Sequence, residues 1–459
     1  MLPAAIGAAF GFASTRLSAG DTDVFWHLAA GRETLAHGLA RVDAYSWTVP
    51  GQPISTDQWL GQVLFALASD LVGWRGIVGL RALGVALLIG LVVYATLRVR
   101  RRPLVAVIAA LPAIMLSASL WTERPQLLGY VCFAALIVLL REARAGGDRA
   151  LLALPVLMVI WANVHGSFAL GAVLIALVAA EGALRDRRRR RTYLVALVLS
   201  AIATIATPSG LGSWTAPGYH LLHPPRELQE WSIPDITALP GAIFAVSLFA
   251  TLTVAFFTRE RAPGEAIILV PVLFVALTAA RQMPLFAIAT APYLARYGGD
   301  AVARIASLVG LHLPTLAQGG TRPNRLVDGI AVGIAAVVLA VGVATGTDRP
   351  SLDGFPTAAV PLLRPGPGLF NQYDWGGYLI ANAAATPVFV DGRFTPYVPD
   401  VIGDYTTVVG VHPGWREVIA RRGIRQILVR PTDPVAVRAR DLGWPIRLSS
   451  DTFLLIDVP

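Results

Sequence analysis

The stretch IVGLRALGVALLIGLVVYATL at residues 77–97, followed by RVRRR at 98–102, decides the class of fold. An apolar run of this length can cross a bilayer as an α-helix, which needs about 20 residues. Arginines directly after such a run are typical of the cytoplasmic side of a membrane. Because similar apolar runs recur along the first 346 residues, the sequence predicts a polytopic membrane protein.

The composition of the chain supports this class. Hydrophobic residues make up 55% of the 459 residues, charged residues 15%, and the mean hydropathy is +0.60. Those values exclude an ordinary soluble domain. The net charge of +9 comes from arginine alone, and the arginine runs separate apolar segments. We therefore interpret them as topology signals and expect no nucleic-acid partner. With Cys132 as the single cysteine, no intrachain disulfide can form.

Eleven transmembrane helices are predicted from the apolar runs. They cover 3–18, 77–97, 104–120, 127–140, 150–163, 168–184, 193–207, 241–257, 266–280, 284–296 and 328–346. Several are too short to cross a bilayer upright, as expected of broken helices that line a cavity.

Arginine-rich breaks between these helices predict the orientation of the chain. The breaks at 98–102, 141–149, 185–191, 258–261 and 296–325 should be cytoplasmic. They alternate with breaks that carry polar motifs, so the motifs should all lie on the outer face. In a bacterial inner membrane, this arrangement places the N-terminus in the cytoplasm and the C-terminus outside it.

Two parts of the chain should lie outside the membrane. Within the predicted transmembrane domain, 1–348, the long first loop at 19–76 has helical patterns at 24–37 and 59–68. A Pro- and Gly-rich linker at 349–368 precedes a small extracytoplasmic α/β domain at 369–459. Its predicted elements are helices at 378–385 and 415–422, and strands at 387–391, 426–429 and 453–456.

The first loop carries the strongest candidates for catalysis. Asp21 and Asp23 stand two residues apart, so they could share a divalent cation, or one could act as a base that the other orients. His27 lies one helical turn after Asp23 and could face the same cavity. Asp23 would also be a good helix N-cap, and that structural role explains the same pattern.

Two arginines at helix ends suit a phosphate. Arg124 and Arg281 both follow the pattern of ionisable residues that face a bundle interior, and a guanidinium matches phosphate geometry. Contact with lipid headgroups would place them equally well. The polar residues Gln126, Asn163, His165 and Gln282 lie in the same breaks and are candidates for substrate or phosphate binding.

A resemblance follows from these motifs. An Asp-x-Asp in the first outer loop, later helices and an outer C-terminal domain resemble the GT-C superfamily of membrane glycosyltransferases. The chain is also similar to a largely uncharacterised family of bacterial membrane proteins. That likeness includes Trp26-His27, Asp43, Arg124-Pro125-Gln126, Asn163-Val164-His165-Gly166, Asp374-Trp375-Gly376-Gly377-Tyr378 and Phe389-Val390-Asp391-Gly392-Arg393. Gln58 departs from the pattern, which would have a glutamate there.

The resemblance implies an inverting sugar transfer from a polyprenyl-phosphate donor to an extracytoplasmic glycan, lipid or protein. Asp21 or Asp23 would be the base that takes the acceptor's proton. The same two acids would be the ligands of a Mg²⁺ or Mn²⁺ ion, if one is used. Arg124 and Arg281 would stabilise the leaving phosphate. His27 and His165 would position acceptor or phosphate. The outer domain would contact the acceptor through Tyr373, Asp374, Trp375, Asp391 and Arg393. Two other classes fit the residues: a transporter of a lipid-linked or anionic substrate, and a non-catalytic envelope assembly protein.

Overall fold

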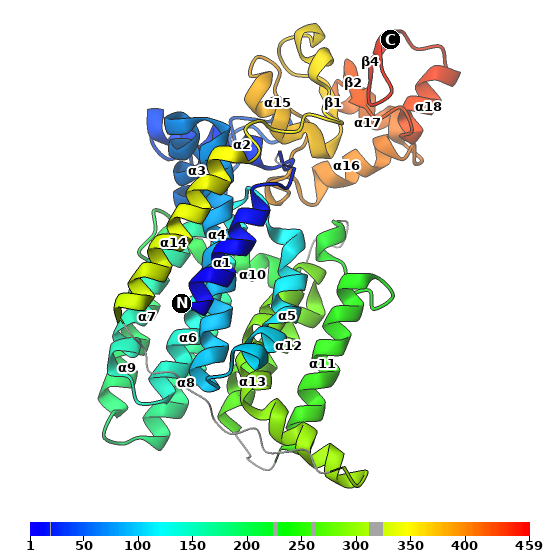
Figure 1. Ribbon diagram of the computed structural model, residues 1–459. Helices are drawn as coiled ribbons and strands as arrows, with labels where there is room; N and C mark the ends of the chain where they lie inside the picture. Colours follow the sequence, from blue (N-terminus) through cyan, green and yellow to red (C-terminus); the bar gives the residue numbers. More distant parts are fainter. Residues whose placement is uncertain (19, 224–227, 259–262, 312–324) are drawn as a thin grey trace. The chain divides into compact units, whose positions relative to one another are not determined.

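The computed structural model describes residues 1–18, 20–223, 228–258, 263–311 and 325–459 (Figure 1). The chain divides into two compact units, and each is described by itself. Residues 1–17 and 78–346 form the first, which we call the helical unit. Residues 18–77 and 347–459 form the second, the mixed unit. The sequence-based boundaries differ, because they group the first loop with the transmembrane residues.

Helices build the whole described part of the helical unit. They are α1 (Leu2–Ser14), α4 (Trp74–Val99), α5 (Pro103–Ser117), η1 (Ala118–Leu120), α6 (Pro125–Arg144), α7 (Asp148–Val164), α8 (Phe168–Arg185), α9 (Arg190–Thr204), η2 (Gly210–Trp214), α10 (Thr215–Leu222), η3 (Gln229–Trp231), α11 (Leu239–Phe257), α12 (Pro263–Thr278), η4 (Ala280–Gln282), α13 (Met283–Leu308) and α14 (Arg325–Thr345).

Each of the eleven predicted spans is a helix in the structure. Among the described residues, six helices are long and apolar enough to cross a membrane. These are Trp74–Val99, Pro103–Leu120, Pro125–Arg144, Phe168–Arg185, Leu239–Phe257 and Leu326–Thr345. Proline near the first turn of α5 and α6 helps to set their starts, since its missing N–H needs no partner there.

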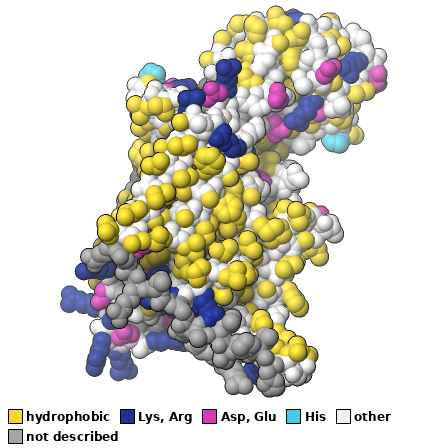
Figure 2. Space-filling view, in the orientation of Figure 1, with side chains coloured by type: hydrophobic (Ala, Val, Ile, Leu, Met, Phe, Trp, Pro, Cys, Tyr) yellow, Lys and Arg dark blue, Asp and Glu magenta, His cyan; other side chains and the backbone are white. Residues whose placement is uncertain are grey.

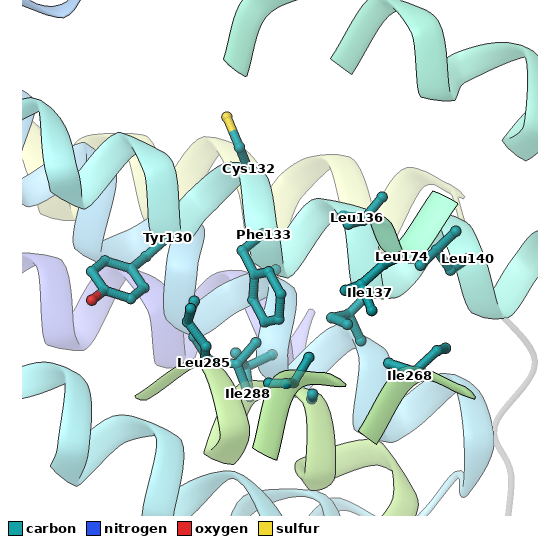
Figure 3. Close-up of a cluster of buried hydrophobic side chains, with 14 of the residues drawn as sticks. Tyr130, Cys132, Phe133, Leu136, Ile137, Leu140, Leu174, Ile268, Leu285 and Ile288 are labelled. Atoms are coloured by element: carbon teal, nitrogen blue, oxygen red, sulfur yellow. The ribbon is translucent and has the colours of Figure 1, made fainter. Parts of the chain in front are cut away.

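Helix α6 lies at the centre of the core of the helical unit. Its Phe133, Leu136 and Ile137 are almost completely buried. Figure 3 shows these side chains beside residues of three other helices, Leu174 of α8, Ile268 of α12, and Leu285 and Ile288 of α13. The packing of α6 therefore holds both of its ends in defined places, which matters for the polar residues found there.

The flank of the helical unit is apolar. Figure 2 shows hydrophobic side chains over this flank and arginines gathered at one end of the unit. Phe249 and Phe256 on α11 are 73% and 80% exposed. Water-soluble proteins rarely expose contiguous apolar surface of this extent, whereas lipid covers it without cost. The protein is therefore a multi-pass membrane protein.

The mixed unit combines the first loop with the C-terminal residues. Its elements are α2 (Val24–His37), α3 (Trp59–Val72), η5 (Thr357–Leu362), β1 (Leu369–Asn371), η6 (Tyr373–Trp375), α15 (Gly376–Asn382), η7 (Thr395–Tyr397), α16 (Asp400–Val409), α17 (Trp415–Arg422), β2 (Gln426–Val429), α18 (Pro434–Asp441), β3 (Ile446–Ser449) and β4 (Leu454–Asp457). The sheet order is β1-β2-β4-β3, with β1 and β2 parallel and the other pairs antiparallel.

The predicted strand at 387–391 is wrong. Val388 makes one isolated bridge, to Ser46, and the segment joins no sheet. Its backbone is satisfied in other ways: Val388 N–H donates to the Tyr45 carbonyl, and Asn371 bonds the backbone of both Phe389 and Val390. A buried extended run needs partners but not a sheet, so hydrophobic pattern alone misassigns it.

Aromatic side chains hold the first loop against the C-terminal residues. Phe25 of α2 packs edge-on against Phe355 and Tyr378, at 5.3 Å between ring centroids in each case. Trp47 donates its indole N–H to the Leu369 carbonyl at 2.9 Å. The loop is thus part of a folded unit, because its large apolar side chains find their partners more than 300 residues later.

Candidate active site

Asp21 and Asp23 lie at the start of α2 in the mixed unit. Asp21 Oδ1 accepts the backbone N–H of Asp23 at 2.9 Å, which folds the loop into a tight turn. Asp23 occupies the N-cap position, but its side chain makes no capping hydrogen bond. Its carboxylate lies against Gly392, where a Cβ atom would come within 1.8 Å of Asp23 Oδ1. Two of the sequence motifs, Asp-x-Asp and Asp-Gly-Arg, therefore meet.

Replacing Gly392 with alanine should disturb the close contact between Gly392 and the Asp23 carboxylate. The added methyl group cannot fit beside Asp23, so the Asp23 carboxylate or the loop must shift, at a cost of about 1–3 kcal/mol. We expect lower thermal stability and weaker activity of Gly392→Ala in the full-length protein. Gly403→Ala is the matched control, because a Cβ there meets nothing within 4 Å. Equal behaviour of the two variants would contradict the close approach.

His27 of α2 is almost completely buried. Its side chain is 2% exposed, and Nδ1 lies 3.4 Å from the amide nitrogen of Gln62 on α3. The ring also lies close to that of Trp26, with 3.7 Å between centroids. His27 thus packs between α2 and α3, and the helical spacing from Asp23 did not reveal this burial.

A buried ionic cluster, which we call the clasp, lies next to the acids. It consists of Asp43, Asp391, Arg393 and Tyr397. Arg393 donates from Nε and Nη2 to the two oxygens of Asp391 at 2.8 and 2.6 Å, from Nη2 to Tyr397 Oη at 2.7 Å, and also from Nη1 to Asp43. The Asp43 and Asp391 side chains are fully buried and that of Arg393 is 7% exposed.

The charges within the clasp shift the pKa values of its members. Burial alone would lower the pKa of Arg393, but Asp391 and Asp43 raise it above its usual value. Burial and the charge of Asp391 likewise raise the pKa of Tyr397. Arg393 is thus the cation of the clasp, which joins segments 350 residues apart. Asp391 and Arg393, which were predicted to contact the acceptor, bind each other in this cluster.

In the helical unit, Arg124 and Arg281 flank one carboxylate. Arg281 Nη1 donates to Glu230 Oε1 at 2.6 Å, and Arg124 Nη1 lies 4.0 Å from Glu230 Oε2. The Arg281 guanidinium also lies over the ring of Trp231, at 4.7 Å from its centroid. Both arginines precede a helix, α6 or α13, whose N-terminal dipole adds positive potential. The arrangement can hold a phosphate, the dianion whose geometry two guanidinium groups match.

His220 of α10 lies beside this group without adding charge to it. Its ring is 5.1 Å from that of Trp231. Burial, followed by the positive charge of Arg281, lowers the pKa of His220 to about 4. At neutral pH the imidazole is therefore uncharged, and the positive potential near Glu230 comes from the arginines.

Gln126 and His165, two other predicted site residues, lie at the same end of the helical unit as Arg124 and Arg281. Gln126 donates to Tyr130 Oη at 3.4 Å, and Tyr130 donates to the Arg281 carbonyl. His165 follows α7 and packs against α6, where a Cβ at Gly129 would lie 3.2 Å from His165 Cγ.

Asn163 and Gln282 are at helix ends of the same unit. Asn163 donates to the carbonyls of Val159 and Ala206 at 2.8 and 2.9 Å, so its amide ties α7 to the chain after α9. Gln282 is the N-cap residue of α13, without a capping bond from its side chain.

The structure thus gathers Arg124, Gln126, His165 and Arg281 in the helical unit, and Asp21 and Asp23 in the mixed unit. Sequence reasoning missed Glu230 and Trp231. Their only signal was a short polar stretch at 229–231 between two apolar segments.

The fold has known counterparts among solved structures. The chain is similar to the oligosaccharyltransferase of Archaeoglobus fulgidus, crystallised with a tethered acceptor peptide containing the NVT sequon. The TM-score is 0.56 and the identity 13%, over 93% of this chain and 68% of that one. It is also similar to ArnT from Cupriavidus metallidurans bound to undecaprenyl phosphate, with a TM-score of 0.52 and 15% identity over 99% and 97% of the two chains.

No model of a protein family matches the chain, and no curated protein matches it. At 13–15% identity the likeness is one of fold. Both solved structures agree with the fold that the resemblance to the GT-C superfamily predicted.

A divalent cation would have few protein ligands at the acids of the first loop. Among the described residues no group of three or more His, Cys, Asp or Glu side chains could hold a metal. Asp21 and Asp23 alone could still hold Mg²⁺, which commonly takes one or two carboxylates and completes its shell with water and phosphate oxygens. The donor set suits a weakly held ion that arrives with a phosphate.

Proposed function

We propose that this protein transfers a sugar from a polyprenyl-phosphate-linked donor to an acceptor outside the cytoplasm. The observation that carries the proposal is the pair Arg124 and Arg281 around one carboxylate, in a chain with the GT-C fold. A similar solved structure binds undecaprenyl phosphate and another an acceptor peptide, which fits a lipid-linked donor.

In this proposal the arginines stabilise the phosphate that leaves the sugar. Negative charge grows on its oxygens as the glycosidic bond breaks, and fixed guanidinium groups bind that charge more strongly than the starting ester. Asp23 takes the proton of the acceptor hydroxyl as it attacks the anomeric carbon, and Asp21 holds the turn that presents Asp23. Mg²⁺ or Mn²⁺ bound by Asp21 and Asp23 would supply further charge neutralisation.

The orientation is also a proposal. Arginines cluster between α8 and α9, and at the ends of α4 and α6, which the positive-inside rule assigns to the cytoplasm. The breaks that contain Arg124, His165 and Arg281 then lie outside, in the inner membrane of a bacterium. All eleven helices of the sequence prediction would cross or enter the bilayer, the N-terminus being inside and the C-terminal residues outside.

The test is transfer of radiolabelled sugar in membranes that contain the protein. A panel of polyprenyl-phosphate sugars is supplied, and label is followed into lipid, glycan and protein fractions. We expect one donor to label one fraction in these membranes and not in membranes lacking the protein. Movement of intact labelled lipid across vesicles, without sugar transfer, would favour a transporter instead.

Glu230 should compete with the donor phosphate for the two arginines. The variant Glu230→Gln keeps the shape of the side chain and removes its charge. We expect polyprenyl phosphate to bind about two- to five-fold more tightly, as for loss of an ion pair that is partly open to solvent. Binding is measured by titration of the purified protein in detergent. Asp235→Asn, in the same segment, is the control. Unchanged or weaker binding of Glu230→Gln would refute the competition.

A further inference from the structure

A cavity of about 450 Å³ lies within the helical unit, at the end opposite to Arg124 and Arg281. Helix α6 shows the separation: it begins after Arg124 and carries Arg141 and Arg144 in its last turn, 20 residues or roughly 30 Å away. Five arginines from four helices line the cavity. They are Arg98, Arg141, Arg144, Arg185 and Arg296.

The cavity is positively charged as a whole. Two carboxylates, Glu142 and Glu265, share the lining, and Glu181 pairs with Arg144 and Arg185 at 3.2 and 3.0 Å. Around the cavity, the described residues include five arginines and these three carboxylates, so the arginines are in excess. Alanine and valine side chains, Ala95, Val99 and Val138, complete the wall and give it an apolar part.

The floor of the cavity is rigidly built. Arg141 makes a two-pronged ion pair with Glu265 at 3.1 and 2.8 Å, and the two side chains are 11% and 9% exposed. Arg144 passes so close to α12 that a Cβ at Gly264 would lie 1.4 Å from its Nη2. Within the described residues, Arg141 Nε is buried without a hydrogen-bond partner. Topology alone requires arginines at this end, but it requires neither their burial nor their convergence on one cavity.

We propose that this cavity binds the phosphate group of an anionic lipid such as phosphatidylglycerol. Arg98 and Arg185 are more than half exposed and can turn toward a ligand, while Arg141 and Arg144 are held in place behind it by Glu265 and Glu181. Guanidinium groups match a phosphodiester, and the apolar wall suits the glycerol and the first acyl carbons. The site is separate from the proposed transfer reaction and does not depend on it.

A charge-matched pair of variants tests the site. The lining variant carries Arg98→Gln, Arg185→Gln and Arg296→Gln, and leaves the Arg141–Glu265 pair intact. The control carries Arg187→Gln, Arg188→Gln and Arg191→Gln, three exposed arginines at the α8–α9 junction that do not line the cavity. Both lose the same charge near the same end of the protein.

The purified full-length proteins are titrated with phosphatidylglycerol, phosphatidylcholine or inorganic phosphate in detergent. Thermal unfolding and lipid retention in native mass spectrometry are the two readouts. We expect phosphatidylglycerol to raise the unfolding midpoint of wild type and control by about 3 °C or more, as ligand binding to the folded state does. The lining variant should lose that rise and retain less of the lipid.

The other possible results of the titrations either assign the anion site to another ligand or overturn the proposal. A similar rise with inorganic phosphate would keep the anion site and assign it to soluble phosphate. Equal losses in both variants would overturn the proposal, since general charge attraction would then explain the binding. Equal effects of phosphatidylcholine would overturn it as well. If the lining variant unfolds early without lipid, its retention of phosphatidylglycerol relative to the control still decides.

Discussion

Asp23→Asn should reduce sugar transfer by about 10²- to 10⁴-fold, the usual contribution of a general base. The amide keeps the size of the carboxylate but cannot accept the proton of the acceptor. Since the Asp23 side chain makes no capping hydrogen bond, α2 should form as before. The measurement is the initial rate of label transfer in membranes with matched protein levels, at saturating donor.

Two further variants sharpen this result. Asp353→Asn, an exposed acid of the same unit, should leave the rate unchanged. Asp21→Asn should weaken the turn and lower the rate less than Asp23→Asn does. If Asp21→Asn proves the more damaging of the two, Asp21 is the base. A rate above about a tenth of wild type in both variants would remove the acids from the chemistry.

Arg393→Met should be the most destabilising single change in the mixed unit. It leaves Asp43 and Asp391 buried without their cation, and breaking a buried ion pair from one side costs about 3–5 kcal/mol. Arg421→Met is the matched control, because Arg421 pairs with Asp404 but is 61% exposed, and such pairs contribute about 0–1 kcal/mol.

Hydrogen exchange in the full-length protein measures this difference where it arises. Amides around Val388 and Tyr397 should exchange at least about a hundred-fold faster in Arg393→Met, while those of α6 keep their protection. Faster exchange confined to the first turn of η7 would contradict a clasp that holds the whole unit. Similar protection in both variants would show that the cluster contributes little to stability.

Much of the fold could be predicted from the sequence, for a local reason. Lipid supplies no hydrogen-bond partners, so a long apolar run must satisfy its own backbone, and a helix is the way to do so. All eleven predicted spans are helices, and the limits of α2, α17 and β2 agree with prediction. Strands β1 and β3 were missed, as each has only three or four residues, and β3 is largely exposed.

The candidate site was predictable in its residue types and less so in its contacts. Arg124 and Arg281 were chosen as candidates because they stand at helix ends, where ionisable residues usually face the interior of a helical bundle. Glu230 was not found, because its partner Arg281 is 51 residues away and no spacing rule joins them. Helical periodicity placed His27 on the side of Asp23, and the structure adds that the side chain is buried beside α3.

By itself, the sequence determined the membrane class and the helices, since the length of an apolar run acts locally along the chain. Only the tertiary structure decided that the first loop belongs with the C-terminal residues. Arg393 selects Asp43 as a partner 350 residues away because both charges leave water and neither is stable there alone. Such a choice depends on which surfaces meet, and no stretch of sequence contains it.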